Sequence, residues 1–468
     1  MSTYTGIPLL TLSGVRDSIS QAVADGATTE VAASCYYDKL KDILQYNPSW
    51  VMMPSFLKDG KAYTMISGLS GSLNVTRTTT PTASRATRVN ASGFIETVTD
   101  NVLRLDYPIG GGCPALLVEA SGQNVCLHSE VFNNAFHFPF NLNAFGSGSV
   151  ANTTATLDPY GTNVADYIQE NSSASAQHSI IDIFAGNVSG TTYTWSVFAK
   201  AAERTIIQLA NNAGGGGTAN FNLITGVATL TNGVSCSMQN YGNGWYRCIL
   251  TYNSTATGNH NVQIRLCDAS GNASYNGTGN QGAYIFGAQL ETGSIATTYI
   301  PTTSAAVSRA AEVISASGAL VSGLIGQTEG TIYAEVDVRN FTQTDRPIIQ
   351  LFLDSNNRIL LEAFFFSPTF GVKGSVITSG SSVANITFAI TNSGIYKIAL
   401  AYKQNDFAFF VNGTLRGTDT LGNLPSSLNA VHLGHNNGSS QLSNYIRAAA
   451  LYTTRLSNDQ LANLTALT

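Results

Sequence analysis

The stretch TYTWSVFAK, residues 192–200, decides the fold class because its large side chains recur at every second position. An alternation with a period of two residues is typical of a β-strand. The stretch GWYRCILTYN, residues 244–253, has the same period, with Trp245 and Arg247 on one side and Tyr246 and Cys248 on the other. Since both sides of each stretch carry apolar residues, we expect strands that are packed on two faces.

Further stretches of this kind follow in residues 331–413, separated by clusters of turn-forming residues. They are TIYAEVDV, IIQLFLDS, RILLEAFFF, IYKIALAYK and FAFFVNG. Many short strands at such spacing favour antiparallel sandwiches over units in which strands alternate with helices. The sequence therefore predicts a mainly β protein.

Helical patterns occur only near the two ends of the chain. Residues 13–46 can form two short helices, with Ser13 as the cap of the first. Near the other end, LSNDQLANL, residues 456–464, contains a capping box with Ser457 at the N-cap and Gln460 three residues later. We expect a short N-terminal helical region and one C-terminal helix around the β structure.

Length and composition narrow the possible partners. The chain has 468 residues, which suggests roughly three domains at about 150 residues each. Charged residues make up only 11%, and the net charge is -5 without a cluster of Lys or Arg. Such a chain has little to neutralise a phosphate backbone, so we expect no nucleic-acid partner. A surface rich in hydroxyls and amides suits neutral sugars or other proteins, and it is equally what any turn-rich β protein displays.

We expect no secretory signal peptide at the start of the sequence. Its start, MSTYTGIPLLTLSGVRDS, lacks the basic and apolar regions of a secretory signal, and no stretch is apolar for long enough to span a membrane. We therefore expect synthesis in a cytoplasm and no membrane insertion. The cysteines show no C-x-x-C spacing and are expected to be buried free thiols rather than zinc ligands. They are Cys35, Cys113, Cys126, Cys236, Cys248 and Cys267.

One unusual stretch occurs twice. SRATRVNASG, residues 84–93, returns as SRAAEVISASG, residues 308–318, and both copies follow a stretch with Pro and Thr. The upstream proline biases each copy toward extended structure. We expect both copies to run along a domain boundary. Arg85 and Arg309 are then candidates for inter-module contacts with a carboxylate or with backbone carbonyls.

The stretch GAYIFGAQLETGSIATTYIPTTSAAVSRAAE, residues 282–312, resembles the closing strand and exit linker of a jelly-roll module that recurs in tail and head fibre proteins of bacteriophages. This module is similar to carbohydrate-binding modules. Residues 84–136 resemble its lead-in, and YGNGWYRCILTYNSTATG, residues 241–258, resembles one of its central strand pairs.

Residues 329–468 resemble a concanavalin A-like, laminin G-like sandwich. Its marks are an apolar strand followed by Val-Asn-Gly at 411–413 and the final RLSNDQL at 455–461. The resemblance implies five parts: an N-terminal virion-anchoring helical region at 1–72, a connector at 73–125, a jelly roll at 126–305, a linker at 306–328 and the sandwich at 329–468.

By this resemblance the chain is a structural fibre protein of a bacteriophage virion, made in the host cytoplasm. Its N-terminal region would dock on other virion proteins, it would form a homotrimer, and it would bind host-surface glycan. Two alternatives remain open, a non-adhesive head or tail decoration protein and a polysaccharide depolymerase.

Concanavalin A-like folds also include glucanases, whose active strand carries the pattern Glu-x-Asp-x-x-Glu. Here Glu335 and Asp337 occupy the first two positions, on one face of a strand, but Asn340 replaces the third carboxylate. An amide cannot donate a proton to a leaving glycosyl oxygen, and a retaining glycosidase needs two carboxyl groups about 5 Å apart. We therefore expect no hydrolytic activity and name no catalytic residue.

Other candidate sites are weaker. Cys126 and His128 would share one face of a strand, which fits a buried core thiol better than a nucleophile with its base. A structural calcium ion could use carboxylates such as Asp158, Asp166, Asp182 and Asp268, but no dense Asp-x-Asp-x-Asp loop supports a metal site, and no other cofactor is expected. The segment VFNNAFHFPF, residues 131–140, could be a sugar platform or a subunit contact.

Overall fold

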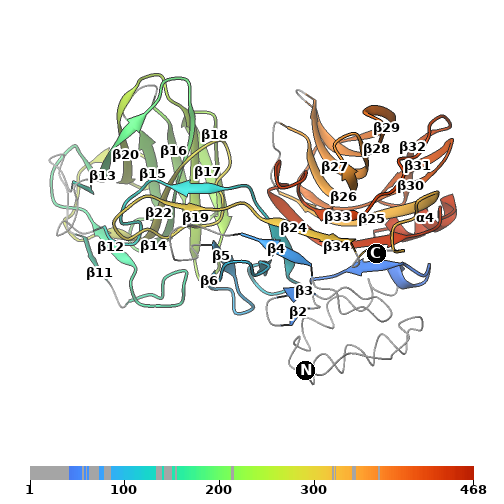
Figure 1. Cartoon of the computed structure of the whole chain (residues 1–468). Coiled ribbons are helices and arrows are strands. Elements are labelled where there is room, and N and C mark those ends of the chain that lie inside the picture. Colours follow the sequence, from blue (N-terminus) through green and yellow to red (C-terminus); the bar gives the residue numbers. More distant parts are fainter. Residues whose placement is uncertain are drawn as a thin grey trace.

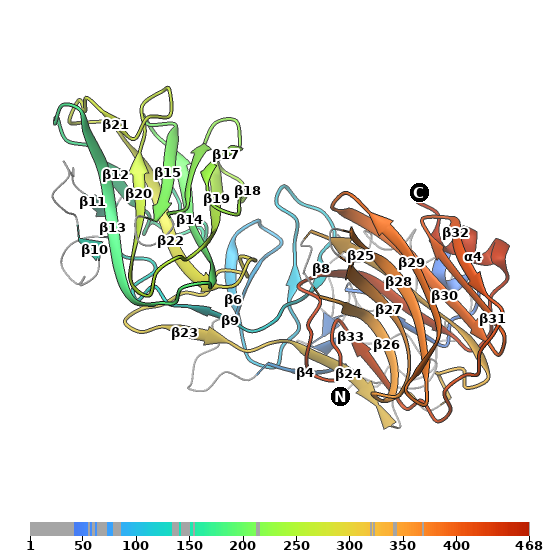
Figure 2. The same cartoon turned by 90° about the horizontal axis from the view of Figure 1, so that it is seen from above.

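The computed structural model describes residues 42–54, 57–58, 61–62, 73–77, 86–132, 140–141, 150–152, 155–211, 216–318, 321, 323–339, 344–366 and 369–467. Within these residues the chain is mainly β, as the sequence predicts. It forms two β lobes that lie side by side, a jelly roll from the middle of the chain and a sandwich from its last third (Figure 1). Strands that precede and follow the jelly roll in sequence lie between the lobes (Figure 2).

Two antiparallel sheets form the jelly roll and enclose one apolar core. The front sheet has the order β10-β13-β20-β15-β16-β17, and β21 pairs with β13. Its strands are β10 (Phe140–Asn141), β13 (Ala176–Asn187), β15 (Ile206–Asn211), β16 (Thr218–Asn222), β17 (Val227–Asn232), β20 (Gly258–Leu266) and β21 (Ser274–Tyr275). The back sheet has the order β11-β12-β22-β14-β19-β18. Its strands are β11 (Val150–Asn152), β12 (Asp166–Gln169), β14 (Thr192–Ala201), β18 (Ser235–Asn240), β19 (Trp245–Asn253) and β22 (Gly282–Thr292).

The two stretches that decide the fold class pair with each other. In the back sheet, Trp195 of β14 lies opposite Leu250 of β19, and both side chains are in the core. The intervening Thr194 and Ser196 are buried as well, so the prediction of strands packed on two faces is confirmed. An aromatic cluster with Ile95 covers part of the outer face of the back sheet. It consists of Phe198, Trp245, Phe286 and Tyr299.

Two further sheets form the sandwich around a second core. The upper sheet has the order β29-β28-β27-β26-β33-β24-β4. Its strands are β4 (Asn74–Thr76), β24 (Val313–Ser317), β26 (Arg346–Asp354), β27 (Asn357–Phe366), β28 (Thr369–Thr378), β29 (Ser381–Ile390) and β33 (Ala430–Leu433). The lower sheet has the order β32-β31-β30-β25-β34-β8-β7, and β1 pairs with β34. Its strands are β1 (Trp50–Met52), β7 (Leu105–Asp106), β8 (Ala115–Val118), β25 (Glu329–Val338), β30 (Gly394–Lys403), β31 (Asp406–Val411), β32 (Thr414–Asp419) and β34 (Asn444–Tyr452).

Segments from the first 125 residues complete the sandwich. β1, β7 and β8 extend its lower sheet beside β34, and β4 extends its upper sheet beside β24. The ranges 73–125 and 306–328, expected as a connector and a linker, therefore supply strands to the sheets of the C-terminal lobe. Three small hairpins or pairs complete the described β structure. They are β2 (Leu57–Lys58) with β3 (Lys61–Ala62), β5 (Ala86–Val89) with β6 (Ile95–Val98), and β9 (Gly122–Asn124) with β23 (Val307–Arg309).

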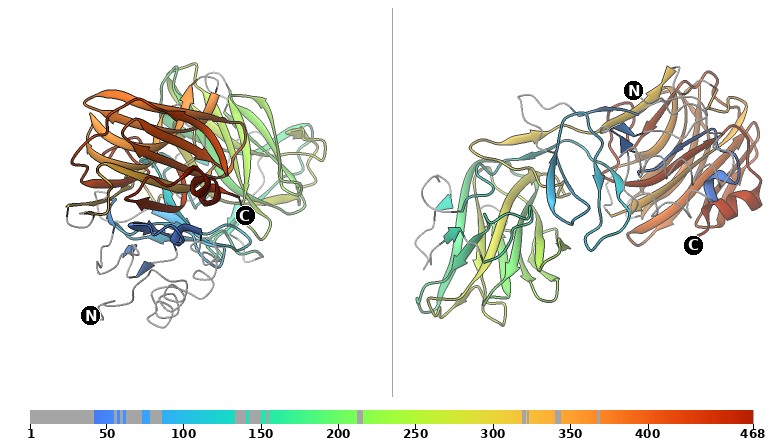
Figure 3. Two further views of the ribbon diagram at one scale, coloured as in Figure 1. Left: turned by 90° about the vertical axis from the view of Figure 1, so that its right-hand side faces the viewer. Right: turned by 90° about the horizontal axis from the view of Figure 1, so that it is seen from below.

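The C-terminal helix α4 (Asn458–Thr465) lies against the outer face of the lower sheet (Figure 3). Both halves of its predicted capping box are present, since the Ser457 side chain accepts from the Gln460 N–H and the Gln460 side chain accepts from the Ser457 N–H. Residues 42–44 are helical, and residues 1–41 of the expected N-terminal helical region lie outside the described residues. The described part of that region also contains the strands β1, β2 and β3. No helix of the described residues is long and apolar enough to cross a membrane.

One prediction about the cysteines is wrong. Cys113 is disulfide-bonded, whereas six free thiols were expected. Cys126, Cys236, Cys248 and Cys267 form no disulfide, and Cys35 lies outside the described residues. Scattered spacing cannot predict such a bond, because a disulfide depends on distance in space rather than in sequence.

Candidate functional site

Arg309 lies at the end of β23 and is fully buried. Its Nη2 donates to the backbone oxygen of Ala120 at 2.8 Å, and the guanidinium forms ion pairs with Glu119 at 3.3 Å and Glu312 at 3.5 Å. Both copies of the repeated stretch contain strands, β5 in the first and β24 in the second. Arg85 lies outside the described residues.

Arg309 belongs to a junction cluster of three arginines and two glutamates. Arg104 donates to Glu312 and to Glu119, each at 2.7 Å, and Arg77 lies 3.2 Å from Glu312. Burial alone would raise the pKa of Glu119, but Arg309 and Arg104 outweigh this effect and lower it to about 2. The side chains are almost completely shielded from solvent, so this cluster joins segments of the chain and offers no surface to a ligand.

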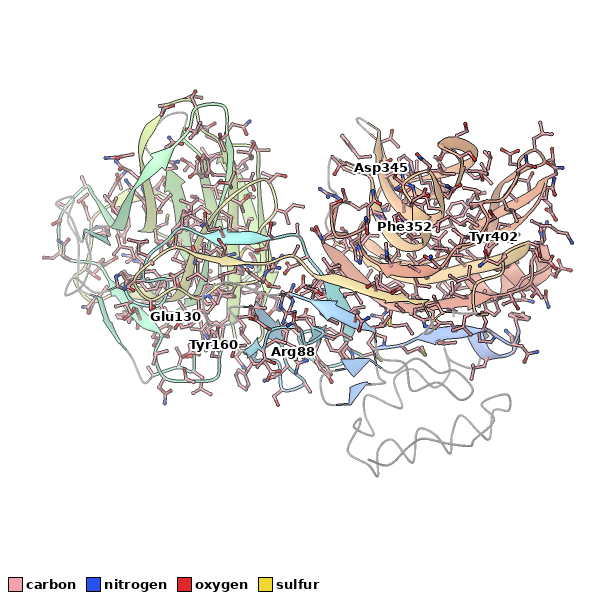
Figure 4. All side chains as sticks on the ribbon, viewed as in Figure 1. Arg88, Glu130, Tyr160, Asp345, Phe352 and Tyr402 are labelled. Carbon is pink, nitrogen blue, oxygen red and sulfur yellow. The ribbon has the colours of Figure 1, made fainter. Side chains whose placement is uncertain are left out.

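The cluster also reaches the jelly roll. Thr298, which follows the last jelly-roll strand, donates its N–H and its hydroxyl to Glu119 at 2.9 and 2.7 Å. Thr87 of β5 donates its hydroxyl to the backbone oxygen of Tyr299. Arg88 of the same strand lies near the junction of the two lobes, while Tyr160 lies in the jelly-roll lobe and Tyr402 in the sandwich lobe (Figure 4). Hydrogen bonds and ion pairs thus connect the repeated stretch to both lobes.

The two acids of the glucanase-like pattern lie on β25 and face away from the sandwich core, in which Ala334, Val336 and Val338 are buried. Glu335 is buried and accepts a hydrogen bond from Arg447 Nε at 2.8 Å. Asp337 forms an ion pair with Arg339 at 2.8 Å. Asn340 lies outside the described residues.

Cys126 and His128 do not lie on a common strand. Cys126 is buried in the jelly-roll core and forms no disulfide. The residues follow β9 in a bend rather than in a strand, so the predicted placement on one strand face is wrong. Asn124 explains the bend, because its side-chain oxygen accepts from the Cys126 N–H at 3.0 Å.

Two of the candidate calcium ligands cap turns. Asp158 caps a turn by accepting from the backbone N–H groups of Tyr160 and Thr162, and Asp268 caps another by accepting from Ser270 and Asn272. Among the residues that the structure describes, no group of three or more His, Cys, Asp or Glu could hold a metal ion.

Asp166 of β12 is buried, and one carboxylate oxygen accepts from the Phe132 N–H at 3.1 Å. Burial raises its pKa to about 6. The side chain of Asp182 lies outside the described residues. Within the aromatic segment 131–140, Phe132 is a core residue of the jelly roll rather than part of an exposed platform. The side chains of Phe136, His137, Phe138 and Phe140 lie outside the described residues.

A row of polar side chains crosses the outer face of the front sheet. Ser179 of β13 lies opposite Arg265 of β20, which lies opposite Gln208 of β15, which in turn lies opposite Asn220 of β16. Their neighbours in sequence, such as Ile264 and Leu209, point into the core, so strand alternation places all four on the outer face. We call these four residues the polar row.

Hydrogen bonds connect most of the polar row. Arg265 Nη1 donates to Gln208 Oε1 at 2.7 Å, Gln208 Nε2 donates to Asn220 Oδ1 at 2.8 Å, and Asn220 Nδ2 donates to the backbone oxygen of Gly271 at 2.8 Å. Arg265 Nε also donates to Gln263 Oε1 at 2.7 Å. These contacts hold the planar amide and guanidinium groups in fixed orientations.

The polar row is sheltered although it lies on an outer face. Arg265 is 7% exposed and Gln208 8% exposed, and burial lowers the pKa of Arg265 below its ordinary value. The Ser179 hydroxyl is buried without a hydrogen-bond partner among the described residues. Amide, guanidinium and hydroxyl groups in a sheltered row can donate to and accept from the hydroxyls of a sugar.

None of these four residues was a sequence-based candidate. The signal was partly present, because β20 alternates Gln263 and Arg265 with Val262, Ile264 and Leu266. The pairing of Arg265 with Gln208, 57 residues away, required the sheet register.

A scan against protein-family models finds no match, and no curated protein is similar enough to count as a relative. Among solved structures, the CBM40 module of the Ruminococcus gnavus IT-sialidase bound to α2,3-sialyllactose is 14% identical with a TM-score of 0.27, over 31% of this chain and 86% of that chain. Domain 4 of a Geobacillus stearothermophilus extracellular arabinanase, in complex with arabinotriose, is 15% identical with a TM-score of 0.28, over 33% and 73%. The pentraxin of Limulus polyphemus is 14% identical with a TM-score of 0.24, over 29% and 69%. The structural neighbours thus include carbohydrate-binding modules and lectin-like β-sandwich domains.

Proposed function

We propose that this chain is a fibre or appendage protein of a bacteriophage virion that attaches to a glycan of the host surface. The polar row carries the glycan part of the proposal, because it lies on the outer face of the front sheet, holds amide and guanidinium groups in fixed orientations and includes the partly exposed Asn220. The sequence resemblance to fibre proteins supports the virion part, with the N-terminal region on other virion proteins and a homotrimeric assembly.

The glycan proposal is tested by binding of the intact chain to a glycan array and to whole host cells. We expect Gln208→Ala to weaken binding about tenfold, the effect of losing roughly 1.4 kcal/mol of hydrogen bonding. Gln404→Ala is the matched control, since this glutamine is exposed in the other lobe. A chain that binds no glycan or cell, or a Gln208→Ala variant that binds like the parent, would contradict the proposal and favour a non-adhesive decoration protein.

The virion part needs its own test. A cryo-EM map of the intact particle would show whether density for two β lobes projects from the head or the tail and where the residues before β1 insert. Purified particles that lack this chain would refute a virion role.

We propose a binding role rather than hydrolysis for the sandwich. Both Glu335 and Asp337 are held in ion pairs with arginines, an arrangement that does not leave a carboxyl group poised to donate a proton. Incubation with host capsule or β-glucan tests this part of the proposal. Release of reducing ends that disappears in Glu335→Gln would instead identify a depolymerase.

A further inference from the structure

The edges of the two jelly-roll sheets meet on one side of the lobe. β17 is the last strand of the front sheet, and β18 is the last strand of the back sheet. Only Gly233 and Val234 separate the two strands in sequence. An edge strand presents unpaired N–H and C=O groups along one side, and these groups can pair with a strand from another chain.

This edge exposes an unusual number of apolar side chains. Five of the six residues of β17 are exposed, and four large apolar residues lie open to solvent within eleven positions of the chain. They are Ile224 at 65% exposure, Val227 at 56%, Leu230 at 38% and Val234 at 50%. We call residues 224–234 the edge stretch.

The edge stretch has no charge that would keep another chain away. The sequence contains no Asp, Glu, Lys, Arg or His between Arg204 and Arg247. Natural edge strands are commonly protected by Lys, by Pro or by inward-pointing charges, and β17 and β18 contain none of these. Other surfaces of the chain carry a net charge of -5, so two copies repel each other least where this uncharged region meets its equivalent.

We propose that the edge stretch is the contact through which a second copy of this chain docks on the jelly roll. The inference rests on the proposed function in one respect: a homotrimeric fibre supplies a second copy of this chain as the partner. A copy docked there would bring the polar rows of neighbouring copies onto adjoining surfaces, where they could bind a repetitive glycan together.

Sedimentation velocity of the intact chain without glycan tests the proposal. The parent chain is expected to sediment as an oligomer of the 49.3 kDa protomer, and the double variant Val227→Lys/Val234→Lys as a monomer. Both side chains are at least half exposed, so lysines can be accommodated without disturbing the core. The matched control is Leu415→Lys, an exposed leucine on the edge strand β32, which already contains Arg416 and Asp419.

Each result is informative. An unchanged Leu415→Lys oligomer together with a monomeric double variant supports the edge stretch as the contact. A double variant that remains oligomeric would place the subunit contact elsewhere while leaving a fibre assembly intact. A monomeric parent chain would overturn the proposed contact, and glycan binding by that chain, measured separately, would test the proposed function on its own.

Discussion

Arg104 and Glu312 form an ion pair with an Nε–Oε1 distance of 2.7 Å, and neither side chain is exposed to solvent. The two residues are 208 positions apart in the sequence, one before the jelly roll and one after it. In the sequence, the entire jelly roll is therefore inserted between two residues that form an ion pair with each other. Glu312 also accepts a hydrogen bond from Arg77 and, through its other oxygen, one from the Glu119 N–H. One carboxylate thus connects the segments around Arg77, Arg104 and Glu119 to its own segment.

Replacing this carboxylate should be strongly destabilising. We expect Glu312→Gln to lower the free energy of unfolding by about 3–5 kcal/mol, because three buried guanidinium groups would then share one glutamate. Chemical denaturation measures the loss. The control is Glu96→Gln, whose partner Arg88 lies at the same 2.7 Å but near the surface, where a pair contributes about 0–1 kcal/mol. Equal losses in both variants would contradict this account.

Glu170 should make the jelly roll sensitive to acid. It is buried and accepts hydrogen bonds from Arg204, Tyr275 and Thr278. Burial alone would raise its pKa, but these donors lower it to about 2. Since the folded pKa lies below the unfolded value, the carboxylate stabilises the fold above about pH 4.5, and this stabilisation, about 3 kcal/mol, is lost as the pH falls toward 2. Glu170→Gln should be less stable at neutral pH and show a flatter dependence of Tm on pH; an unchanged profile would argue against the assignment.

Asp166 should have the opposite effect from Glu170 and lower the stability of the fold as the pH rises. Burial raises its pKa to about 6, so the folded state binds the proton more tightly than the unfolded state. Its contribution is most favourable at low pH and is lost as the pH rises through 6, at a cost of up to about 3 kcal/mol. Asp166→Asn keeps an oxygen for the Phe132 N–H and removes the charge. We expect it to raise Tm above pH 6 and to have little effect near pH 4, as measured by calorimetry at both values; a lower Tm at pH 8 would contradict the prediction.

The capping box of α4 should make a smaller contribution to the free energy of unfolding. Ser457→Ala removes the acceptor for the Gln460 N–H and should cost about 1 kcal/mol. Ser457→Asp restores an acceptor at the N-terminus of the helix and should recover most of the stability. Urea denaturation of the three chains compares them, and a fully stable Ser457→Ala chain would show that the cap is dispensable.

The sandwich should not fold from residues 329–468 alone. That fragment lacks β1, β4, β7, β8 and β24, and it would uncover the sheet edges at β33 and β34 as well as core positions. We expect the isolated fragment to aggregate or to lack cooperative unfolding, as followed by circular dichroism. A fragment that melts cooperatively like the intact chain would show that the added strands are accessory.

The sequence patterns predicted the β class, the strands around Trp195 and Trp245 and the capping box at Ser457 because each depends on residues close together in the chain. The polar row and the junction cluster were not predicted, because their members are far apart in the sequence. Their members come together only through sheet register, as when Gln208 meets Arg265 or Arg77 meets Glu312 across 235 residues. The extra strands of the sandwich were missed because two to five residues are too few to show a period.

The pairing of β1 with β34 also sets the order in which the molecule can be completed. Ser49, just before β1, hydrogen-bonds the backbone oxygen of Leu451, 402 residues later in the chain. A ribosome therefore releases the first strand of the lower sheet long before its neighbour exists, and contacts so distant in sequence form slowly. The sheet cannot close around β34 until residues 444–452 have been translated, so a chain that ends before them leaves β1 without its neighbouring strand.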